Sequence, residues 1–345
     1  MSLNVVTDTG KLSELGWEAF VDAHPEGTVF QSPDMYELFQ YTKRMRPVVI
    51  GVTDTYTGTL KGICLAVIIR EISGLAGYFS SRTVVYGGPL TDPSATDRQD
   101  ILGLLLDGLI SNVQRSSIFI QFRNFSNQDG NREAFTAEGF HLRERLNLIV
   151  DTTSRETVVR NMSASRWRQV KKGLAQGAKC IEPENTDQVR EFYEILYNLY
   201  KYKVKKPLPS WDFFAEFYRI SSAGRLGVIR LVEYKGKIIG GILSPVTPGK
   251  TIYEWYVCGL DQEYKEVHPS VLATWAAIDY ALEHRIPKFD FMGVGIPERE
   301  YGVREFKSRF GGEMVNYGRF ARINHKALYA LAEAGYNLLA ILKKI

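Results

Sequence analysis

A lysine and two phenylalanines near the end of the chain are the residues whose types and spacing best suit chemistry. Residues 289–292 form an apolar run typical of a strand, and two closely spaced glycines end it. After a charged segment come Phe306, Lys307 and Phe310. In a helix the two phenylalanines share one face, and Lys307 can project past that face into a cleft. A lysine fixed beside an apolar wall can stabilise an oxyanion or neutralise a phosphate, and the alternative is a solvated lysine on an amphipathic turn.

The most basic stretch of the chain, residues 154–180, contains a second candidate group. Arg166, Arg168, Lys171 and Lys172 lie within one predicted helix of this stretch. Because residues three and four positions apart are neighbours on a helix, Arg168 and Lys172 lie along one flanking face with Lys171. This helix face is either simply solvated or binds anions such as phosphates.

Signatures of several other chemistries are absent from the sequence. There is no GxSxG nucleophile motif, no P-loop, and no GxGxxG after a predicted strand. The five histidines lack metal-ligand spacing, and the three cysteines show neither zinc-motif spacing nor a disulfide framework. Two of them, Cys64 and Cys258, fall in apolar runs and are expected to be buried thiols. We therefore expect no metal and no resident cofactor.

The composition is that of an ordinary soluble protein with about two domains. The 345 residues are 45% hydrophobic and 24% charged, which is average for globular proteins. The formal net charge of +4 fits an anionic substrate without requiring one. The N-terminus lacks a basic region followed by an apolar run, and no apolar stretch reaches the roughly 18 residues of a membrane span. We expect a cytoplasmic location.

One order of predicted elements occurs twice, about 175–180 residues apart. It consists of two hairpin strands, a third strand, a helix, a fourth strand and an irregular tail. The first copy comprises residues 46–70, 78–88, 97–115 and 118–122, and the second comprises residues 226–246, 251–259, 270–284 and 289–292. A repeat of this length is a duplicated domain rather than a solenoid. Lys307 has no counterpart in the first copy, where Phe135 is followed by a threonine, and this asymmetry favours a functional lysine.

We therefore predict an α/β protein with two duplicated domains, each a mixed sheet with helices on both faces. The predicted domains are residues 1–150 and 151–323, and residues 324–345 follow as a C-terminal amphipathic helix. The helix docks on its own protein or, alternatively, makes peripheral contact with a membrane surface.

The repeated order resembles the GNAT acyltransferase unit. A GNAT unit that uses acyl-CoA holds the pyrophosphate on backbone N–H groups of a Gly-rich loop at a helix N-terminus. The corresponding segments here, residues 90–94 and 263–269, contain no glycine. The sequence therefore argues against ordinary acetyl-CoA binding in either copy.

Nearly the whole chain resembles the Fem family of aminoacyl-tRNA-dependent transferases. The resemblance is most specific at residues 28–32 (TVFQS), at residues 163–173 (SASRWRQVKKG), and at residues 289–293 (FDFMG) with the later Phe306-Lys307 and Phe310-Gly311-Gly312. It implies tandem GNAT-like domains and a reaction in which an amine of a peptide acceptor attacks an aminoacyl ester on tRNA.

The resemblance also implies roles for particular residues. Lys307 would stabilise the tetrahedral oxyanion or the leaving ribose oxygen, and Phe306 would shape the pocket for the aminoacyl ester. The basic residues Arg166 to Lys172 would approach tRNA phosphates. The donor would be aminoacyl-tRNA, the acceptor a peptide or nucleotide-linked precursor of peptidoglycan or another envelope polymer, and DNA would not be a partner.

The chain departs from the family where some members hold the phosphates of a nucleotide-linked muropeptide. Those positions fall near Glu37 and Leu208, and neither side chain can bind a phosphate. Lys43 and Arg44 lie near the first position, Lys205 and Lys206 lie near the second, and all four are candidate substitutes. The acceptor is therefore open.

Four further residues are candidates for lining the substrate cleft, within or between the copies: Tyr86, Tyr253, Tyr256 and Asp290. Tyr253 and Tyr256 are alternatively core aromatics with satisfied hydroxyls. Asp290, between two phenylalanines on a strand, points to the opposite side from them, as a structural carboxylate or as a general base for the acceptor amine.

Three hypotheses remain. The first is an N-aminoacyltransferase that uses aminoacyl-tRNA, the second a GNAT-like N-acyltransferase with another acyl donor, and the third a non-catalytic binding protein on the same fold.

Overall fold

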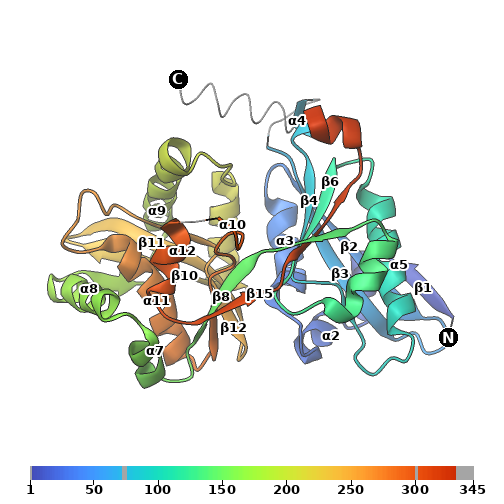
Figure 1. Ribbon diagram of the computed structural model, residues 1–345, viewed down its shortest axis with the longest axis horizontal. Coiled ribbons are helices and arrows are strands. Elements are labelled where there is room, and N and C mark those ends of the chain that lie inside the picture. The colour runs from blue at the N-terminus through green and yellow to red at the C-terminus, as the bar shows by residue number, and fades with distance from the viewer. Residues whose placement is uncertain (1, 72–75, 300–301, 332–345) are drawn as a thin grey trace. The chain divides into compact units, whose positions relative to one another are not determined.

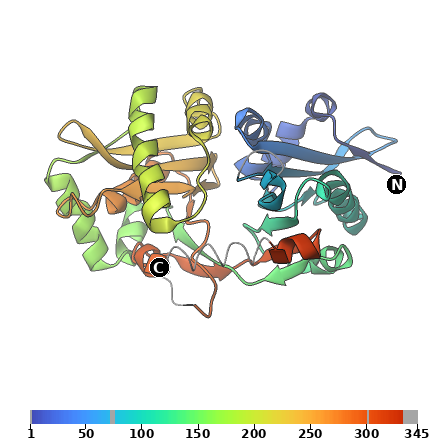
Figure 2. The same cartoon turned by 90° about the horizontal axis from the view of Figure 1, so that it is seen from above.

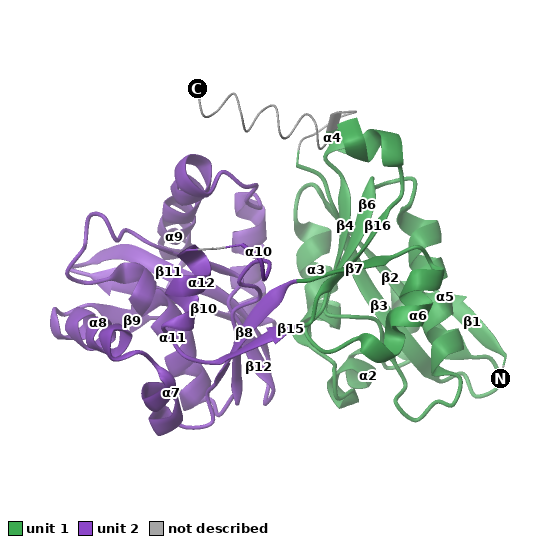
Figure 3. Ribbon diagram, in the orientation of Figure 1, with its two compact units in different colours: residues 1–144, 317–345 green, residues 145–316 purple. Residues whose placement is uncertain are grey.

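The chain divides into two compact units, shown in the computed structural model of Figures 1 and 3, which describes residues 2–71, 76–299 and 302–331. Unit 1 comprises Met1–Glu144 and Tyr317–Ile345, and unit 2 comprises Arg145–Asn316. Each unit contains one mixed eight-stranded sheet. The architecture is thus α/β and duplicated, as the sequence predicts.

The sheet of unit 1 has the strand order β1-β2-β3-β4-β6-β16-β7, and β5 pairs with β3. Its strands are β1 Leu3–Val6, β2 Met45–Asp54, β3 Leu60–Ile69, β4 Arg82–Tyr86, β5 Leu90–Thr91, β6 Phe119–Arg123, β7 His141–Arg143 and β16 Arg319–Ile323. The pair β4 and β6 is parallel, and the other pairs are antiparallel.

Helices cover both faces of this sheet (Figure 2). They are α1 Thr9–Glu14, α2 Trp17–Ala23, α3 Pro33–Tyr41, α4 Ala76–Phe79, α5 Arg98–Val113 and α6 Arg132–Ala137, with 3-10 turns at Val29–Gln31 and Asp129–Asn131. On β2, Ile50 lies against Gly108 of α5, whereas a side chain at Gly51 would meet Leu12 of α1. Because successive strand residues face opposite sides, α5 and α1 pack on opposite faces. The Ser32 hydroxyl caps the start of α3, and a proline occupies its first turn.

The sheet of unit 2 has the strand order β15-β8-β14-β12-β11-β10-β9, and β13 pairs with β11. Its strands are β8 Leu146–Asp151, β9 Lys179–Ile181, β10 Gly227–Tyr234, β11 Lys237–Thr247, β12 Thr251–Tyr253, β13 Tyr256–Gly259, β14 Lys288–Asp290 and β15 Glu313–Asn316. The pair β12 and β14 is parallel, and it matches the pair β4 and β6 of unit 1.

The helices of unit 2 again form two layers around the sheet. They are α7 Arg155–Asn161, α8 Ala164–Ala175, α9 Thr186–Leu199, α10 Trp211–Ser221, α11 Pro269–Glu283 and α12 Gly302–Ser308, with a π-helical turn at Tyr200–Val204. A side chain at Gly240 of β11 would meet Pro269 of α11, and one at Gly241 would meet Phe192 of α9. The two helices therefore pack on opposite faces of β11.

The two units exchange one strand each. Strand β8 follows β7 in the chain but pairs with β14 and β15 of unit 2. Strand β16 follows β15 but pairs with β6 and β7 of unit 1. The units thus divide at 144/145 and 316/317, not at the predicted 150/151 and 323/324, because backbone pairing assigns β8 and β16 to the opposite unit from their chain neighbours.

The last residues that the structure describes form the start of the predicted C-terminal helix. Residues 326–331 of the predicted C-terminal helix are helical, and the ring of Tyr329 packs edge-on against Phe119 at 5.7 Å. The remainder of that helix, including its predicted membrane contact, lies outside the described residues.

Cys64 and Cys258 are buried as predicted, and burial raises the pKa of the Cys64 thiol to about 12. Within the described residues, the helices are too short or too polar to span a membrane.

Candidate active site

The sheet of unit 2 forks where β12 ends. Tyr253 of β12 is in register with Asp290 of β14, and the Glu254 N–H donates to the Asp290 carbonyl at 2.9 Å. Beyond this point the chain on one side continues as β13 along β11. On the other side the N–H groups of Phe291 and Val294 bond to carbonyls of residues 148 and 146. We call residues 254–255 and 291–293 the β-fork.

Lys307 reaches the β-fork from α12. Its Nζ donates to the Phe291 carbonyl at 2.8 Å and the Gly293 carbonyl at 3.3 Å, and it forms an ion pair with Glu254 Oε1 at 2.9 Å. The Nζ atom also lies 5.2 Å from the centre of the Phe291 ring. Lys307 therefore lies on a helix beside the apolar Phe291 ring, as expected. The alternative of a solvated lysine is wrong, because the Lys307 side chain is only 11% exposed. An ammonium has three N–H donors, and here each has an acceptor, so Lys307 does not project unpaired into a cleft.

Glu254 is the residue of this cluster that sequence reasoning missed. Its side chain is 3% exposed, and its second carboxylate oxygen accepts from the Thr274 hydroxyl on α11 at 3.2 Å. Its sequence signal is simple, because Glu254 is the one charged residue in the aromatic run of residues 251–259. Buried charges require a partner, so the run already implied a cation nearby.

Asp290 lies at the end of β14 and is 2% exposed. Burial raises the pKa of its carboxyl to about 7, against the opposing effects of the Met292 N–H, Lys307 and Asn147, and the charge of Glu254 adds to the rise. The Met292 N–H donates to Asp290 Oδ1 at 2.6 Å. The carboxyl therefore holds the turn after β14 and can also exchange a proton near neutral pH.

Phe306 is held by Arg166, which the sequence had suggested as a phosphate ligand. Arg166 is 3% exposed, donates from Nη2 to the Phe306 carbonyl at 2.9 Å and donates from Nη1 to Gln169 at 2.8 Å. Its guanidinium lies 4.3 Å from the Phe306 ring centre and 4.7 Å from that of Phe310. Burial, together with the charge of Arg309, lowers the pKa of Arg166 to about 10. Arg166 thus fixes α12 and is covered by these contacts, whereas the sequence suggested an exposed phosphate ligand.

The other predicted basic residues lie on the surface. Arg168, Lys171 and Lys172 of α8 are exposed, and Lys172 forms an ion pair with Glu266. Lys171 lies 5.9 Å from the Trp167 ring centre. The structure thus separates Arg166 from its three basic neighbours in the sequence.

Lys205 and Lys206 are also exposed and follow the π-helical turn after α9.

The predicted tyrosines are spread over both units. Tyr86 is 6% exposed in unit 1, where its ring stacks on Phe30 at 5.3 Å and its hydroxyl accepts from Arg123 at 3.3 Å. Tyr253 is 3% exposed, and burial raises its pKa. Tyr256 is half-buried, and its ring lies 5.4 Å from that of Phe214. Tyr253 fits the alternative of a core aromatic, and Tyr256 lies in an aromatic cluster beside β13. Tyr86 is buried as well, in the core of unit 1.

The N-terminus of α11, where a GNAT unit would hold a pyrophosphate, is occupied by a side chain of the same chain. Asp261 accepts from the Ser270 N–H at 3.0 Å and from its hydroxyl at 2.5 Å. The next two N–H groups bond to the His268 carbonyl, and Pro269 has no N–H. A pocket of about 330 Å³ adjoins this end, lined by Arg166, Gln169, Asp261, His268, Val271, Gly302, Glu305, Phe306 and Arg309.

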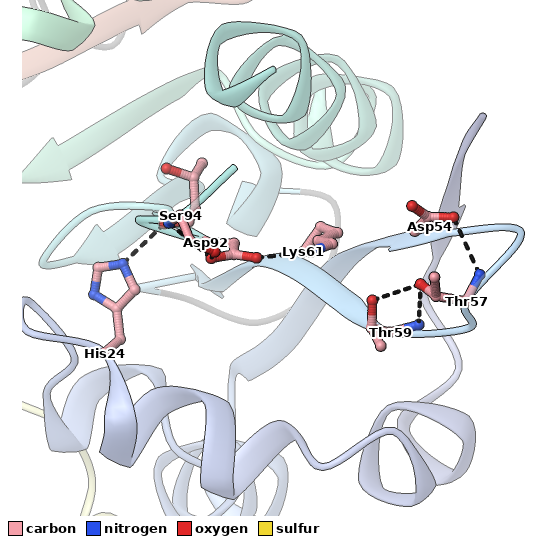
Figure 4. A network of polar contacts seen from close by, with 8 residues as sticks. His24, Asp54, Thr57, Thr59, Lys61, Asp92 and Ser94 are labelled. Carbon is pink, nitrogen blue, oxygen red and sulfur yellow. Dashed lines mark hydrogen bonds and ion pairs between the residues drawn. The ribbon is translucent and has the colours of Figure 1, made fainter. Parts of the chain in front are cut away.

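Unit 1 also has an aspartate between the corresponding strand and helix, as Figure 4 shows. Asp92 follows β5, forms an ion pair with Lys61 at 2.8 Å and accepts from the Ser94 hydroxyl at 2.6 Å. Burial by itself would raise the pKa of Asp92, but the bonds from Lys61 and Ser94 lower it to about 2. In both units, then, a carboxylate engaged within its own chain lies in the strand-to-helix segment.

Comparisons with known proteins agree with this architecture. Residues 160–308 match the acetyltransferase (GNAT) domain family. An aminoacyltransferase FemA from Staphylococcus epidermidis is 28% identical over 104 residues, which cover 29% of this chain and 24% of FemA. The aligned part of this chain thus spans about a quarter of the length of that relative.

Solved structures cover almost the whole chain. FemX superposes with a TM-score of 0.70 at 16% identity, over 96% of this chain and 99% of FemX. A lysylphosphatidylglycerol synthase (L-PGS) from Bacillus licheniformis gives 0.57 at 12% identity, over 95% of this chain and 96% of that one. A tandem GNAT protein from the clavulanic acid biosynthesis pathway gives 0.56 at 12% identity, over 94% and 99%. Residues 160–308 therefore match a GNAT domain, and the chain has the same fold as FemX, with two GNAT-like units in tandem.

Proposed function

We propose that this protein is an acyltransferase of the Fem-like kind, which moves an aminoacyl group from aminoacyl-tRNA to an amine of a peptidoglycan or other cell-envelope precursor. The similarity to a FemA aminoacyltransferase and the GNAT domain at residues 160–308 support the reaction class. Because aminoacyl-tRNA is a cytoplasmic compound, the proposal includes a cytoplasmic location.

The observation that carries the choice of donor is the Asp261 cap of α11. A pyrophosphate bound at a helix N-terminus needs free N–H groups and a favourable field. At α11, Asp261 accepts from both donors of Ser270, and its charge would repel a second anion. The loop of residues 263–269 also has no glycine that would let backbone approach a phosphate closely. Both features disfavour a CoA donor. They favour aminoacyl-tRNA, an ester donor whose phosphates would not have to bind at the N-terminus of α11.

The proposed chemistry is the displacement of an ester by an amine. The acceptor nitrogen attacks the ester carbonyl carbon, the nitrogen loses a proton, and the bond to the ribose oxygen breaks as that oxygen gains a proton. Lys307 would stabilise the oxyanion by exchanging its longest bond, 3.3 Å to the Gly293 carbonyl, for one to the substrate. Phe306 would form the wall beside it. Asp290, whose pKa burial raises to about 7, is the candidate base.

The surface residues would bind the charged parts of the substrates. Arg168, Lys171 and Lys172 form an exposed basic face on α8 and would contact tRNA phosphates. Lys205 and Lys206 would contact phosphates or carboxylates of the acceptor. Tyr256, half-buried beside β13, would line the acceptor side of the site.

A transfer assay tests the proposal. Purified protein is incubated with tRNA charged with labelled amino acids, and with a nucleotide-linked muropeptide or lipid-linked precursor as acceptor. We expect RNase-sensitive transfer that falls at least about a hundredfold in Lys307→Met. The control variant is Lys237→Met, an exposed lysine of β11, which should retain wild-type transfer.

The GNAT match favours a second candidate function, an N-acyltransferase with another acyl donor. The same assay separates the two, because transfer from acetyl-CoA that survives RNase treatment would replace the first proposal by the second. Absence of transfer from every donor, with tRNA or precursor still bound, would instead identify a non-catalytic binding protein.

A further inference from the structure

We infer that Glu254 is a positioning residue for Lys307, whose ammonium it holds at the β-fork in the orientation that transfer requires. The inference takes its reaction, aminoacyl transfer, from the proposed function. The choice of Glu254 rests on the geometry of the β-fork. It adds to the site a carboxylate that lies 53 positions before the lysine in the chain.

Glu254 is itself fixed from three directions. One carboxylate oxygen pairs with Lys307 at 2.9 Å and the other accepts from Thr274 at 3.2 Å. The backbone N–H of Glu254 bonds to the Asp290 carbonyl at 2.9 Å, which anchors the residue to β14. A side chain bound at both oxygens and at its own backbone has little freedom to follow a moving partner. The lysine is therefore held by a rigid group.

The two other acceptors of Lys307 are carbonyls that an unusual turn brings to it. Met292, which lies between them in the chain, has φ 55° and Gly293 has φ 130°, and both values are unfavourable for ordinary L-residues. Strained backbone of this kind persists where surrounding contacts fix it, and here Asp290 holds the Met292 N–H. The carbonyls supply partial charges, whereas Glu254 supplies a full negative charge bonded to the ammonium.

This arrangement explains how Lys307 could serve a substrate without losing its place. If the ammonium gives up the 3.3 Å bond to Gly293 for a developing oxyanion, Glu254 and the Phe291 carbonyl still hold it through two bonds. Without Glu254, the ammonium would keep only its two carbonyl acceptors, whose partial charges hold it less firmly than a carboxylate does. We therefore expect the loss of Glu254 to misplace Lys307 rather than to abolish substrate binding.

Kinetics of a double-mutant cycle test the positioning role. Glu254→Gln should lower kcat about ten- to a hundredfold and leave KM within about threefold. Glu254→Asp, which keeps the charge on a shorter side chain, should recover part of that loss. If Glu254 acts through Lys307, then Lys307→Met/Glu254→Gln should be no slower than Lys307→Met alone. Losses that multiply in the double variant, or a rise in KM with kcat unchanged, would overturn the inference.

A second measurement needs no substrate. The rate at which acetic anhydride acylates Lys307 at one fixed pH, followed by mass spectrometry, reports how firmly the ammonium is held. We expect Glu254→Gln to raise this rate severalfold, because a lysine that has lost its charged partner leaves its hydrogen-bonded position more often. The matched control is Glu182→Gln, which removes an ion pair with Arg230 at 3.0 Å elsewhere in unit 2.

The two measurements separate the possible failures. Unchanged labelling in Glu254→Gln would overturn the positioning role whether or not the wild type transfers an aminoacyl group. Faster labelling of Lys307 in Glu254→Gln, without transfer from any donor by the wild type, would overturn the proposed reaction and leave the ion pair as a structural element. If Glu254→Gln fails to fold, the cycle is measured with Glu254→Asp instead, and Lys307→Met/Glu254→Asp should be no slower than Lys307→Met alone.

Discussion

Asp290 is the residue at which burial and neighbouring charge compete most directly. Burial raises the pKa of its carboxyl in the folded state to about 7, whereas the pKa of an aspartate in an unfolded chain is about 3.9. Between these values the unfolded chain binds fewer protons than the folded one, so this group's contribution to stability is full below about pH 4 and is lost as pH rises through 7. Asp290→Asn should therefore gain stability over the wild type, by a few kcal/mol at most, on going from pH 5 to pH 8.

Urea unfolding at the two pH values measures this difference. Asp279→Asn, an aspartate paired with Arg155 on the surface of unit 2, serves as the control. A stability difference between wild type and Asp290→Asn that is the same at both pH values would show that the buried carboxyl does not titrate in this range.

Arg166 acts through shape as well as charge. Its planar guanidinium lies against two rings and donates in two directions, and a lysine cannot reproduce this geometry. We expect Arg166→Lys to lower the free energy of unfolding by about 2 kcal/mol, whereas Arg168→Lys on the exposed side of α8 should change it by less than about 0.5 kcal/mol. Equal effects of the two substitutions in urea unfolding would contradict the positioning role of Arg166.

The exposed basic face of α8 should behave in the opposite way. Replacing Arg168, Lys171 and Lys172 with alanine should leave thermal stability nearly unchanged. The same substitutions should weaken tRNA binding, and the slope of log Kd against log salt should fall by about two to three, because each lost cation releases one counterion fewer. Filter binding at 50 and 200 mM salt checks both quantities. Binding that keeps its salt slope would place the tRNA phosphates on another surface.

At the scale of elements, local patterns predicted what depends on local contacts. The spacing of Phe306, Lys307 and Phe310 predicted a helix with Lys307 beside an apolar wall, and the structure has α12 there with Lys307 against the Phe291 ring. Glu254 was missed because its partner lies 53 positions away, and no helical or strand periodicity links the two. Arg166 was grouped with its basic neighbours because its charge suggested exposure, although it lies four positions before the buried Val170 on the same side of α8.

The start of α11 offers a prediction about one element. Asp261 caps this helix from the loop before it, through both the N–H and the hydroxyl of Ser270. Asp261→Ala should lower the free energy of unfolding by about 1 kcal/mol, the usual cost of losing such a cap. Denaturant unfolding measures the loss. Ser270→Ala removes one of the two bonds and should cost less, so a larger loss in Ser270→Ala than in Asp261→Ala would contradict the assigned cap.

For the whole molecule, the exchanged strands explain why the boundary suggested by the sequence repeat, 150/151, differs from the boundary between the two compact units, 144/145. The duplication was visible as a repeated order of elements, but strand exchange has no local signature, since β8 looks like the natural end of the first copy. In unit 2, β8 lies between β14 and β15, and Leu148 and Val150 belong to its core. Removing them forfeits about 2 kcal/mol for each side chain, in addition to two hydrogen-bonded ladders.

This topology predicts different behaviour for two fragments that differ by six residues. The fragment 145–316 retains every strand of the unit 2 sheet and should unfold cooperatively in urea. The fragment 151–316, cut at the boundary that the repeat suggests, loses the strand that joins β14 to β15 and exposes two unpaired edges. It should be unfolded or aggregated, which circular dichroism and gel filtration would show. If 151–316 unfolded in the same cooperative transition as 145–316, the exchanged strand would be dispensable, and each copy of the repeat would be an independent domain after all.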